Sequence, residues 1–162
     1  MLSDLENIAE PIENGLSFED NAKIKSEYFY NITNITSLSD DSGFIVDELA
    51  DYPGINTARL AKKLGGEQKV IDHIFSKFRN RKELKSTFYC SLAIIGKKEN
   101  LICSGKVEGK IIPNKIGEKG FGYDPYFIPS NKSKTFAEMK DNEKMMISHR
   151  FQAFKVLANQ KL

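Results

Sequence analysis

The chain has 162 residues, 40% of them hydrophobic and 28% charged, which fits one globular domain with a sizeable core and excludes two large domains. Lys and Arg number 24 against 22 Asp and Glu, and so small a positive excess disfavours a nucleic-acid partner. No apolar run approaches the ~20 residues that cross a bilayer, and the acidic, polar first residues are unlike a secretory signal. We therefore expect a single cytoplasmic domain over residues 1–162, without a nucleic-acid or membrane partner.

A helix is predicted near the start of the chain. Ser17 is suited to cap it, acidic residues follow in the first turn, and apolar side chains recur at helical spacing from Phe18 to Phe29. Lys25 falls on this stripe. A lysine on the core-facing side of a helix either extends its ammonium group to solvent or points it at an anion.

Two short strands and two helices are predicted next. Residues 34–38 and 44–46 have strand character and flank a polar turn, and helical patterns cover residues 56–63 and 67–78.

The second half of the chain predicts a hairpin, a loop and a helix. The hairpin strands are expected over 87–95 and 101–107, the glycine-bearing loop over 117–122 and the helix over 143–157. This mixture of elements predicts an α/β domain with a mixed sheet.

Cysteine and histidine are scarce. Cys90 and Cys103 fall in predicted strands without the spacing of a zinc or redox motif, so we expect buried free thiols. His73 and His149 are too few and too far apart in sequence to suggest a histidine metal cluster.

Two adjacent acids stand in the polar turn between the first predicted strands. Asp40 and Asp41 precede Ser42 and Gly43, and carboxylates are ligands that Mg²⁺ prefers, often together with substrate phosphates. Neighbouring side chains point in different directions there, so one acid can face a site while the other supports the turn. The alternative is a turn whose polar side chains only satisfy their own backbone.

Two further stretches are suited to bind a ligand. Glycines flank Phe121, so that the ring can approach a flat base closely, and a core phenylalanine in a turn is the alternative. His149 and Arg150 lie in the last predicted helix, one turn after Lys144. Their donors could read a carbonyl or neutralise a phosphate, and a solvated basic face is the alternative.

Together these groups form the inventory of a nucleoside-triphosphate hydrolase. There are acids for a divalent cation, lysines for phosphates, an aromatic ring for a base and donors for the edge of the base. The chain has no GxxxxGK[ST] phosphate loop, so a P-loop enzyme is excluded.

Segments spread over nearly the whole chain occur in the order of one family. They are Glu13-Asn14-Gly15-Leu16-Ser17-Phe18, Asn21-Ala22-Lys23-Ile24-Lys25, Asp40-Asp41-Ser42-Gly43-Phe44, Pro53-Gly54-Ile55 with Ala58-Arg59, Phe121-Gly122-Tyr123-Asp124-Pro125-Tyr126-Phe127, Thr135-Phe136-Ala137-Glu138-Met139, and Lys144 with Ser148-His149-Arg150. Together they resemble the inosine-triphosphate pyrophosphatase family, which hydrolyses ITP, dITP and XTP to monophosphate and pyrophosphate and so cleans the nucleotide pool. The resemblance implies an elongated α/β fold with a central mixed sheet, two lobes, a cleft between them, and a homodimer.

The resemblance also implies a role for each matching residue. Asp41 resembles the catalytic acid that helps hold Mg²⁺ and activates water, and Glu13 resembles a second carboxylate of the metal site. Lys25 resembles the lysine that faces the phosphates, and Ser42 resembles a substrate contact. In the base pocket, Phe121 would be the stacking ring, with Gly122, Tyr123 and Asp124 as its neighbours. The residues that bind the purine would be Lys144, His149 and Arg150.

One departure from the family pattern precedes Glu13. Family members begin with a strand and a Thr/Ser-Asn-x-x-Lys loop that holds the triphosphate, and this chain shows no such segment. We therefore expect the N-terminal βα unit to be missing. The explanations left open are a misplaced start codon and a truncated gene, whose product would be a weak or inactive homologue that only folds or dimerises.

Overall fold

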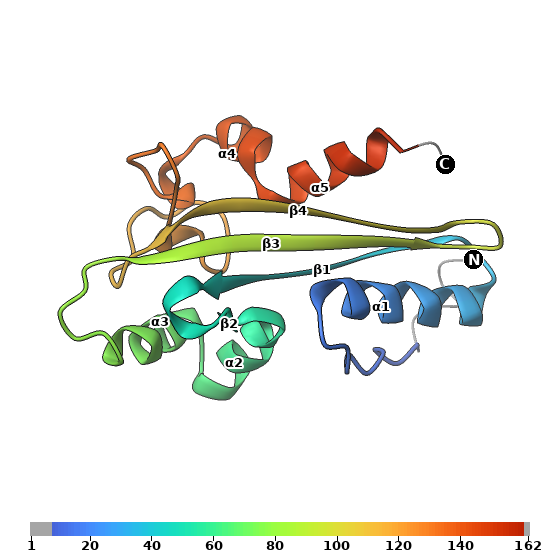
Figure 1. The fold of residues 1–162 in the computed structure, drawn as a ribbon, viewed down its shortest axis with the longest axis horizontal. Coiled ribbons are helices and arrows are strands. Elements are labelled where there is room, and N and C mark those ends of the chain that lie inside the picture. Colours follow the sequence, from blue (N-terminus) through green and yellow to red (C-terminus); the bar gives the residue numbers. More distant parts are fainter. Residues whose placement is uncertain (1–7, 161–162) are drawn as a thin grey trace.

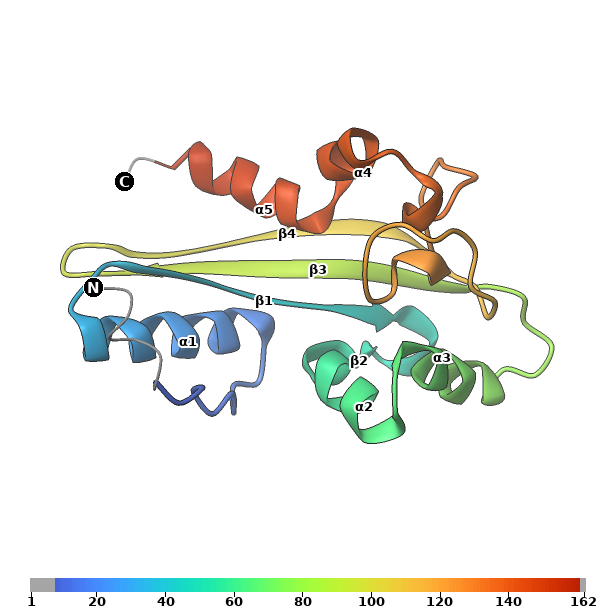
Figure 2. The same cartoon turned by 180° about the vertical axis from the view of Figure 1, so that it is seen from behind.

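The structure is a computed structural model that describes residues 8–160. Its frame is a long twisted sheet with helices on both faces (Figures 1 and 2). The strands lie in the order β2-β1-β3-β4-β5, with the bounds β1 Ser37–Val46, β2 Tyr52–Pro53, β3 Leu84–Ile95, β4 Asn100–Ile111 and β5 Phe127–Pro129. The predicted α/β class and elongated shape are confirmed.

The strand pairs of residues 8–160 are antiparallel throughout, whereas a mixed sheet was expected. The chain leaves β1 and enters β3 at the same end of the sheet, and a short turn over 96–99 joins β3 to β4 (Figure 1). Parallel pairing needs a crossover that carries the chain back to the opposite end, and none of these connections does so.

The helices divide between the two faces of the sheet. Helix α1 lies along one face, α2 and α3 lie beyond its end, and α4 and α5 cover the opposite face (Figures 1 and 2). Their bounds are α1 Phe18–Thr33, α2 Thr57–Leu64, α3 Glu67–Ser76, α4 Asp141–Ile147 and α5 His149–Ala158. The predicted first helix is confirmed, because the Ser17 hydroxyl accepts the Asp20 N–H at 3.0 Å and the Phe18 side chain is buried. Within residues 8–160 no helix is long and apolar enough to cross a membrane.

The polar stretch in the middle of β1 is strand and not turn. Each residue of β1 has a partner on β3, from Ser37 opposite Ile95 to Val46 opposite Ser86. The expectation of two short strands around a turn was therefore wrong. Asp and Gly favour turns locally, but pairing with a long neighbouring strand overrides that preference.

The last predicted helix is two helices that break at Ser148. This residue has an extended backbone (φ −66°, ψ 151°), and its hydroxyl accepts the Phe151 N–H at 3.2 Å as the cap of α5. The expectation of one continuous helix was wrong because a serine can satisfy a helix start as well as continue a helix. The break places His149 and Arg150 in the first turn of α5.

Two clusters of buried side chains stabilise the two ends of the sheet. The larger lies near α3 and contains Phe44, Val70, Ile71, Phe88, Phe127 and Phe136 among others. The smaller lies under α5 and includes Cys90 and Cys103, which are buried free thiols as predicted. The buried core of the described residues is therefore divided between the two ends of the sheet.

Helix α5 packs directly on β4 at Gly105. A Cβ built on this glycine would collide with backbone atoms of His149 and Ala153. No side chain can move aside to relieve such a contact, so the glycine sets how closely the helix approaches the sheet.

We predict that Gly105→Ala destabilises the fold by about 1–3 kcal/mol, the usual cost of overpacking, and shifts α5 outward. Chemical denaturation measures the first effect, and the chemical shifts of residues at the start of α5 report the second. Lys106→Ala is the matched control, since Lys106 is exposed on the next position of β4. Equal stability of the two variants would contradict the prediction.

Candidate active site

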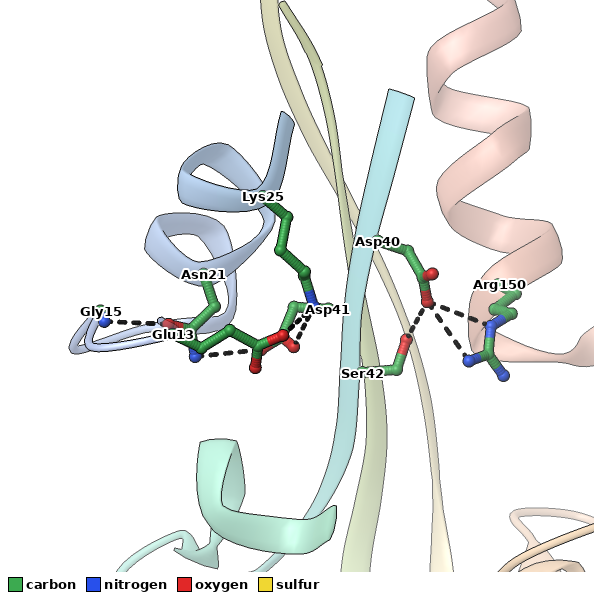
Figure 3. Close-up of polar contacts among 8 residues, drawn as sticks. All are labelled: Glu13, Gly15, Asn21, Lys25, Asp40, Asp41, Ser42 and Arg150. Carbon is green, nitrogen blue, oxygen red and sulfur yellow. Dashed lines mark hydrogen bonds and ion pairs between the residues drawn. The ribbon is translucent and has the colours of Figure 1, made fainter. Parts of the chain in front are cut away.

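Two carboxylates and an ammonium group meet on the face of β1 that α1 covers (Figure 3). Lys25 Nζ lies 2.8 Å from Asp41 Oδ1 and 3.0 Å from Glu13 Oε1. Helix α1 directs Lys25 toward the sheet, so its ammonium group points at two carboxylates and not at solvent. Of the two orientations that the sequence allowed for this lysine, the structure shows the one toward an anion. Two negative charges share one positive charge at this point.

A buried asparagine holds this cluster together. Asn21 is fully buried, its Oδ1 accepts the Gly15 N–H at 2.9 Å, and its Nδ2 donates to Asp41 Oδ2 at 3.3 Å. The loop that carries Glu13 is thereby tied to β1 through one side-chain amide. Asn21 also lies one helical turn before Lys25, so both side chains face the same carboxylate.

Burial and charge shift the ionisation of this cluster. Burial would lower the pKa of Lys25, but its bonds to Asp41 and Glu13 outweigh burial, and the pKa is raised. Burial raises the pKa of the Asp41 carboxyl, and Lys25 and Asn21 offset only part of that effect. Lys25 is therefore held in its charged form, and Asp41 is a more basic carboxylate than a solvated one.

An ion pair lies on the opposite face of the same strand (Figure 3). Asp40 Oδ2 accepts from Arg150 Nε at 3.3 Å, from Arg150 Nη2 at 3.2 Å and from the Ser42 hydroxyl at 3.0 Å. Asp40 and Asp41 point to opposite faces because side chains alternate along a strand. The continuous strand excludes the simple turn that was the alternative to a site.

The ring of Phe121 stands beside two cations. It is 65% exposed, with Lys144 Nζ at 4.6 Å and Arg150 Cζ at 5.5 Å from its centroid. This exposure excludes a core phenylalanine. A hollow of about 270 Å³ adjoins the ring, lined by Phe121, Phe136, Lys144, Met145, His149 and Arg150 among others.

The loop that carries Phe121 is fixed by a buried acid. Asp124 is 3% exposed and accepts both the Phe121 N–H at 2.7 Å and Lys144 Nζ at 2.5 Å. A Cβ on Gly120 would strike the Asp124 carboxylate, which explains the glycine there. The carboxylate thus holds the ring and the lysine in one arrangement.

Gly122 and Tyr123, the other two predicted pocket residues of this loop, do not border the hollow beside Phe121. Gly122 has φ +56° and borders a second hollow of about 110 Å³ that also reaches Ser42. Tyr123 packs its ring on Phe44 at 4.5 Å, and its buried hydroxyl has no hydrogen-bond partner in the described part of the chain. Burial raises the pKa of Tyr123 far above its usual value. Tyr123 therefore supports the pocket from the core side.

His149 is buried and neutral. Burial, together with the positive charges of Arg150 and Lys144, lowers its pKa to about 3. Its ring packs edge-on against Phe88 at 5.4 Å, and among residues 8–160 its Nδ1 finds no hydrogen-bond partner. A solvated basic face is thus excluded for His149, which lines the hollow instead.

The structure gathers the predicted residues into two groups, and β1 separates them. Glu13, Lys25 and Asp41 lie on the α1 face, and the base-pocket residues lie on the α5 face, where Ser42 joins them. The outer edge of β1 pairs with β2 only at Ile45 and Val46. Within residues 8–160 the stretch 40–43 therefore has no partner strand on that edge.

Sequence reasoning missed two residues that contact the predicted site. Asn21 could have been found from its spacing of four from Lys25 on one helix, because such residues share a face. Asp40 was noted only as part of an acidic pair, and strand alternation would have placed it opposite Asp41.

The chain is similar to a known protein family and to proteins of solved structure. Residues 1–160 match the Ham1 family. A dITP/XTP pyrophosphatase of Bacillus anthracis is 38% identical over 161 residues, covering 96% of this chain and 80% of the relative.

Proteins of solved structure from the same family share the fold of this chain. The Ham1 protein of Staphylococcus aureus has a TM-score of 0.87 at 36% identity, covering 96% of this chain and 82% of that one. The nucleoside-triphosphatase / dITP/XTP pyrophosphatase of Mycobacterium abscessus has a TM-score of 0.78 at 32% identity, covering 96% and 81%. The fold is therefore that of the Ham1 proteins. The chain belongs to the Ham1 family, and the resemblance found in its motifs is confirmed.

We predict that the buried His149 makes stability depend on pH. Its folded pKa of about 3 lies below the ordinary 6.5, so between these values the unfolded chain binds a proton that the folded chain does not. Stability then falls as pH falls, by about 2 kcal/mol between pH 7 and 5 from this residue. Denaturation of the protein and of His149→Gln at both pH values isolates the effect, and parallel losses in both proteins would contradict it.

Proposed function

We propose that this chain hydrolyses deaminated purine nucleoside triphosphates, ITP, dITP and XTP, to monophosphate and pyrophosphate. One observation carries the proposal. A carboxylate–lysine cluster lies on one face of β1, and a hollow beside an exposed aromatic ring lies on the other. Relatives named dITP/XTP pyrophosphatase, which align with most of the chain, support the same substrate class.

The residues of the α1 face fit Mg²⁺. Glu13 and Asp41 already share one cationic group, the Lys25 ammonium. Residues 8–160 contain no cluster of three or more His, Cys, Asp or Glu side chains suited to hold a metal. Two carboxylates suffice for Mg²⁺, which usually keeps several waters and takes substrate phosphates as further ligands. When bound, the ion would spread the negative charge of the phosphates and of the leaving pyrophosphate.

The protein groups around that position have separate tasks. Asp41 is suited to accept a proton from the attacking water, because Asn21 and Lys25 fix the orientation of its carboxylate. Lys25 carries the positive charge that stabilises negative charge developing on the phosphate oxygens.

The α5 face would select the base. Phe121 offers a face for stacking, and Arg150 offers donors at the border of the hollow. Hypoxanthine and xanthine present a 6-oxo acceptor where adenine presents an amino donor, so adenine would leave these donors unpaired. His149, being neutral, can serve as donor or acceptor toward the base edge. We further propose, from the family resemblance, that the chain works in the cytoplasm as a homodimer.

We predict that Asp41→Asn lowers the rate of pyrophosphate release from ITP with Mg²⁺ by about 10²–10⁴-fold, because the variant cannot accept the proton of water. Asp47→Asn, which changes an exposed acid after β1, is the matched control and should retain the full rate. An inactive parent protein would favour the alternative, a homologue that only folds or dimerises. Equal rates for parent and Asp41→Asn would remove the catalytic role.

We predict that Phe121→Ala weakens ITP binding by about 1–3 kcal/mol, the range for loss of one base–aromatic stack. Calorimetric titration with ITP in Ca²⁺, chosen to slow turnover, measures the change. Phe154→Ala, which removes another half-exposed ring from α5, is the control and should bind ITP normally. Unchanged affinity of Phe121→Ala would exclude stacking on this ring.

A further inference from the structure

We propose that Asp40 is a positioning residue that orients Arg150 at the base hollow and so sets which purine is accepted; this inference rests on the proposed function. Asp40 is not among the residues to which the family resemblance assigns a role. It lies on the α5 face of β1, and its carboxylate accepts two hydrogen bonds from Arg150 in the first turn of α5.

One carboxylate oxygen fixes one edge of the guanidinium group. Asp40 Oδ2 accepts from both Nε and Nη2 of Arg150, at 3.3 and 3.2 Å, while the Ser42 hydroxyl holds the same oxygen from the strand side (Figure 3). A guanidinium group is planar and carries five donors in a rigid fork. Once the Nε–Nη2 edge is engaged, the orientation of the Nη1 donors is also set. Nη1 has no hydrogen-bond partner within residues 8–160, so it remains for a ligand.

The charges around Phe121 are balanced pair by pair. Lys144 and Arg150 flank the ring, and each cation has its own carboxylate, Asp124 for the lysine and Asp40 for the arginine. A neutral base entering the hollow therefore meets oriented donors without a net positive charge. Without Asp40, Arg150 would be an uncompensated and mobile cation, which attracts any anionic nucleotide and discriminates poorly between base edges.

The Asp40–Arg150 pair is too exposed to matter much for folding. Its side chains are 42% and 40% exposed, and ion pairs of this kind contribute little to stability. The contribution of Asp40 should therefore appear in substrate selection and not in the melting temperature, which separates a positioning role from a structural one.

The test compares Asp40→Asn, Asp40→Glu and Arg150→Met in steady-state hydrolysis of ITP and ATP with Mg²⁺. Asp40→Asn should raise KM for ITP about tenfold with kcat within twofold, and should lower the preference for ITP over ATP about tenfold, equivalent to about 1.4 kcal/mol. Asp40→Glu keeps the charge and should recover most of that preference. In the Arg150→Met background, Asp40→Asn should have no further effect, because its partner is gone.

Glu83→Gln is the matched control. Glu83 forms an ion pair of similar exposure with Lys110, at 2.6 Å and away from the hollow, so its loss should change neither KM nor preference. Melting temperatures of all variants should agree within about 2 °C.

Three results would overturn the inference. The first is a preference of Asp40→Asn for ITP over ATP that stays within twofold of the parent. The others are an equal loss of that preference when Asp40→Asn is added to Arg150→Met, and a large fall in the melting temperature of Asp40→Asn. If the parent hydrolyses no ITP, the proposed function fails, and inosine binding by calorimetry tests Asp40 separately. Tenfold weaker inosine binding by Asp40→Asn would then support the positioning role, and equal or absent binding would end it.

Discussion

The pairing of β1 with β3 is the constraint on which the whole site depends. It forces a polar stretch into extended backbone, and extended backbone sends neighbouring side chains to opposite faces. Asp41 thereby reaches Lys25 on α1, and Asp40 reaches Arg150 on α5. A register slip of one residue would exchange the two acids, so the ladder has to be specified along its whole length.

The two faces of β1 differ in charge balance, and the difference suits different parts of a nucleotide. On the α1 face, Glu13 and Asp41 oppose the single charge of Lys25, which leaves an excess of negative charge that favours a cation. On the α5 face each cation is matched by a carboxylate, which favours an uncharged base. A metal-bound triphosphate at one side and a purine at the other would satisfy both conditions.

Local signals predicted much of the fold, and long-range contacts decided the rest. The cap at Ser17, the helix pattern of α3 and the β3–β4 hairpin follow from side chains close in sequence, and the structure agrees with them. The continuity of β1 depends on β3, more than 40 residues away in sequence, as the pairing of Asp41 with Ser91 illustrates. The site residues were found through family motifs, but the motifs do not state which face of the strand each residue occupies. For that reason the division into two groups, and the part of Asp40, required the structure.

Two buried polar side chains fix the positions of the loops that carry Glu13 and Phe121. Asn21 ties the Glu13 loop to Asp41, and Asp124 ties the Phe121 loop to Lys144. Burying a polar group is unfavourable unless its hydrogen bonds are made, so each loop is held where its partner lies.

Removing one partner would leave the other buried and unsatisfied, at a larger cost than the bond itself contributes. The loops that carry Glu13 and Phe121 are therefore oriented before any ligand arrives. Such preorganisation lets oriented charge act on a ligand without first rearranging the protein.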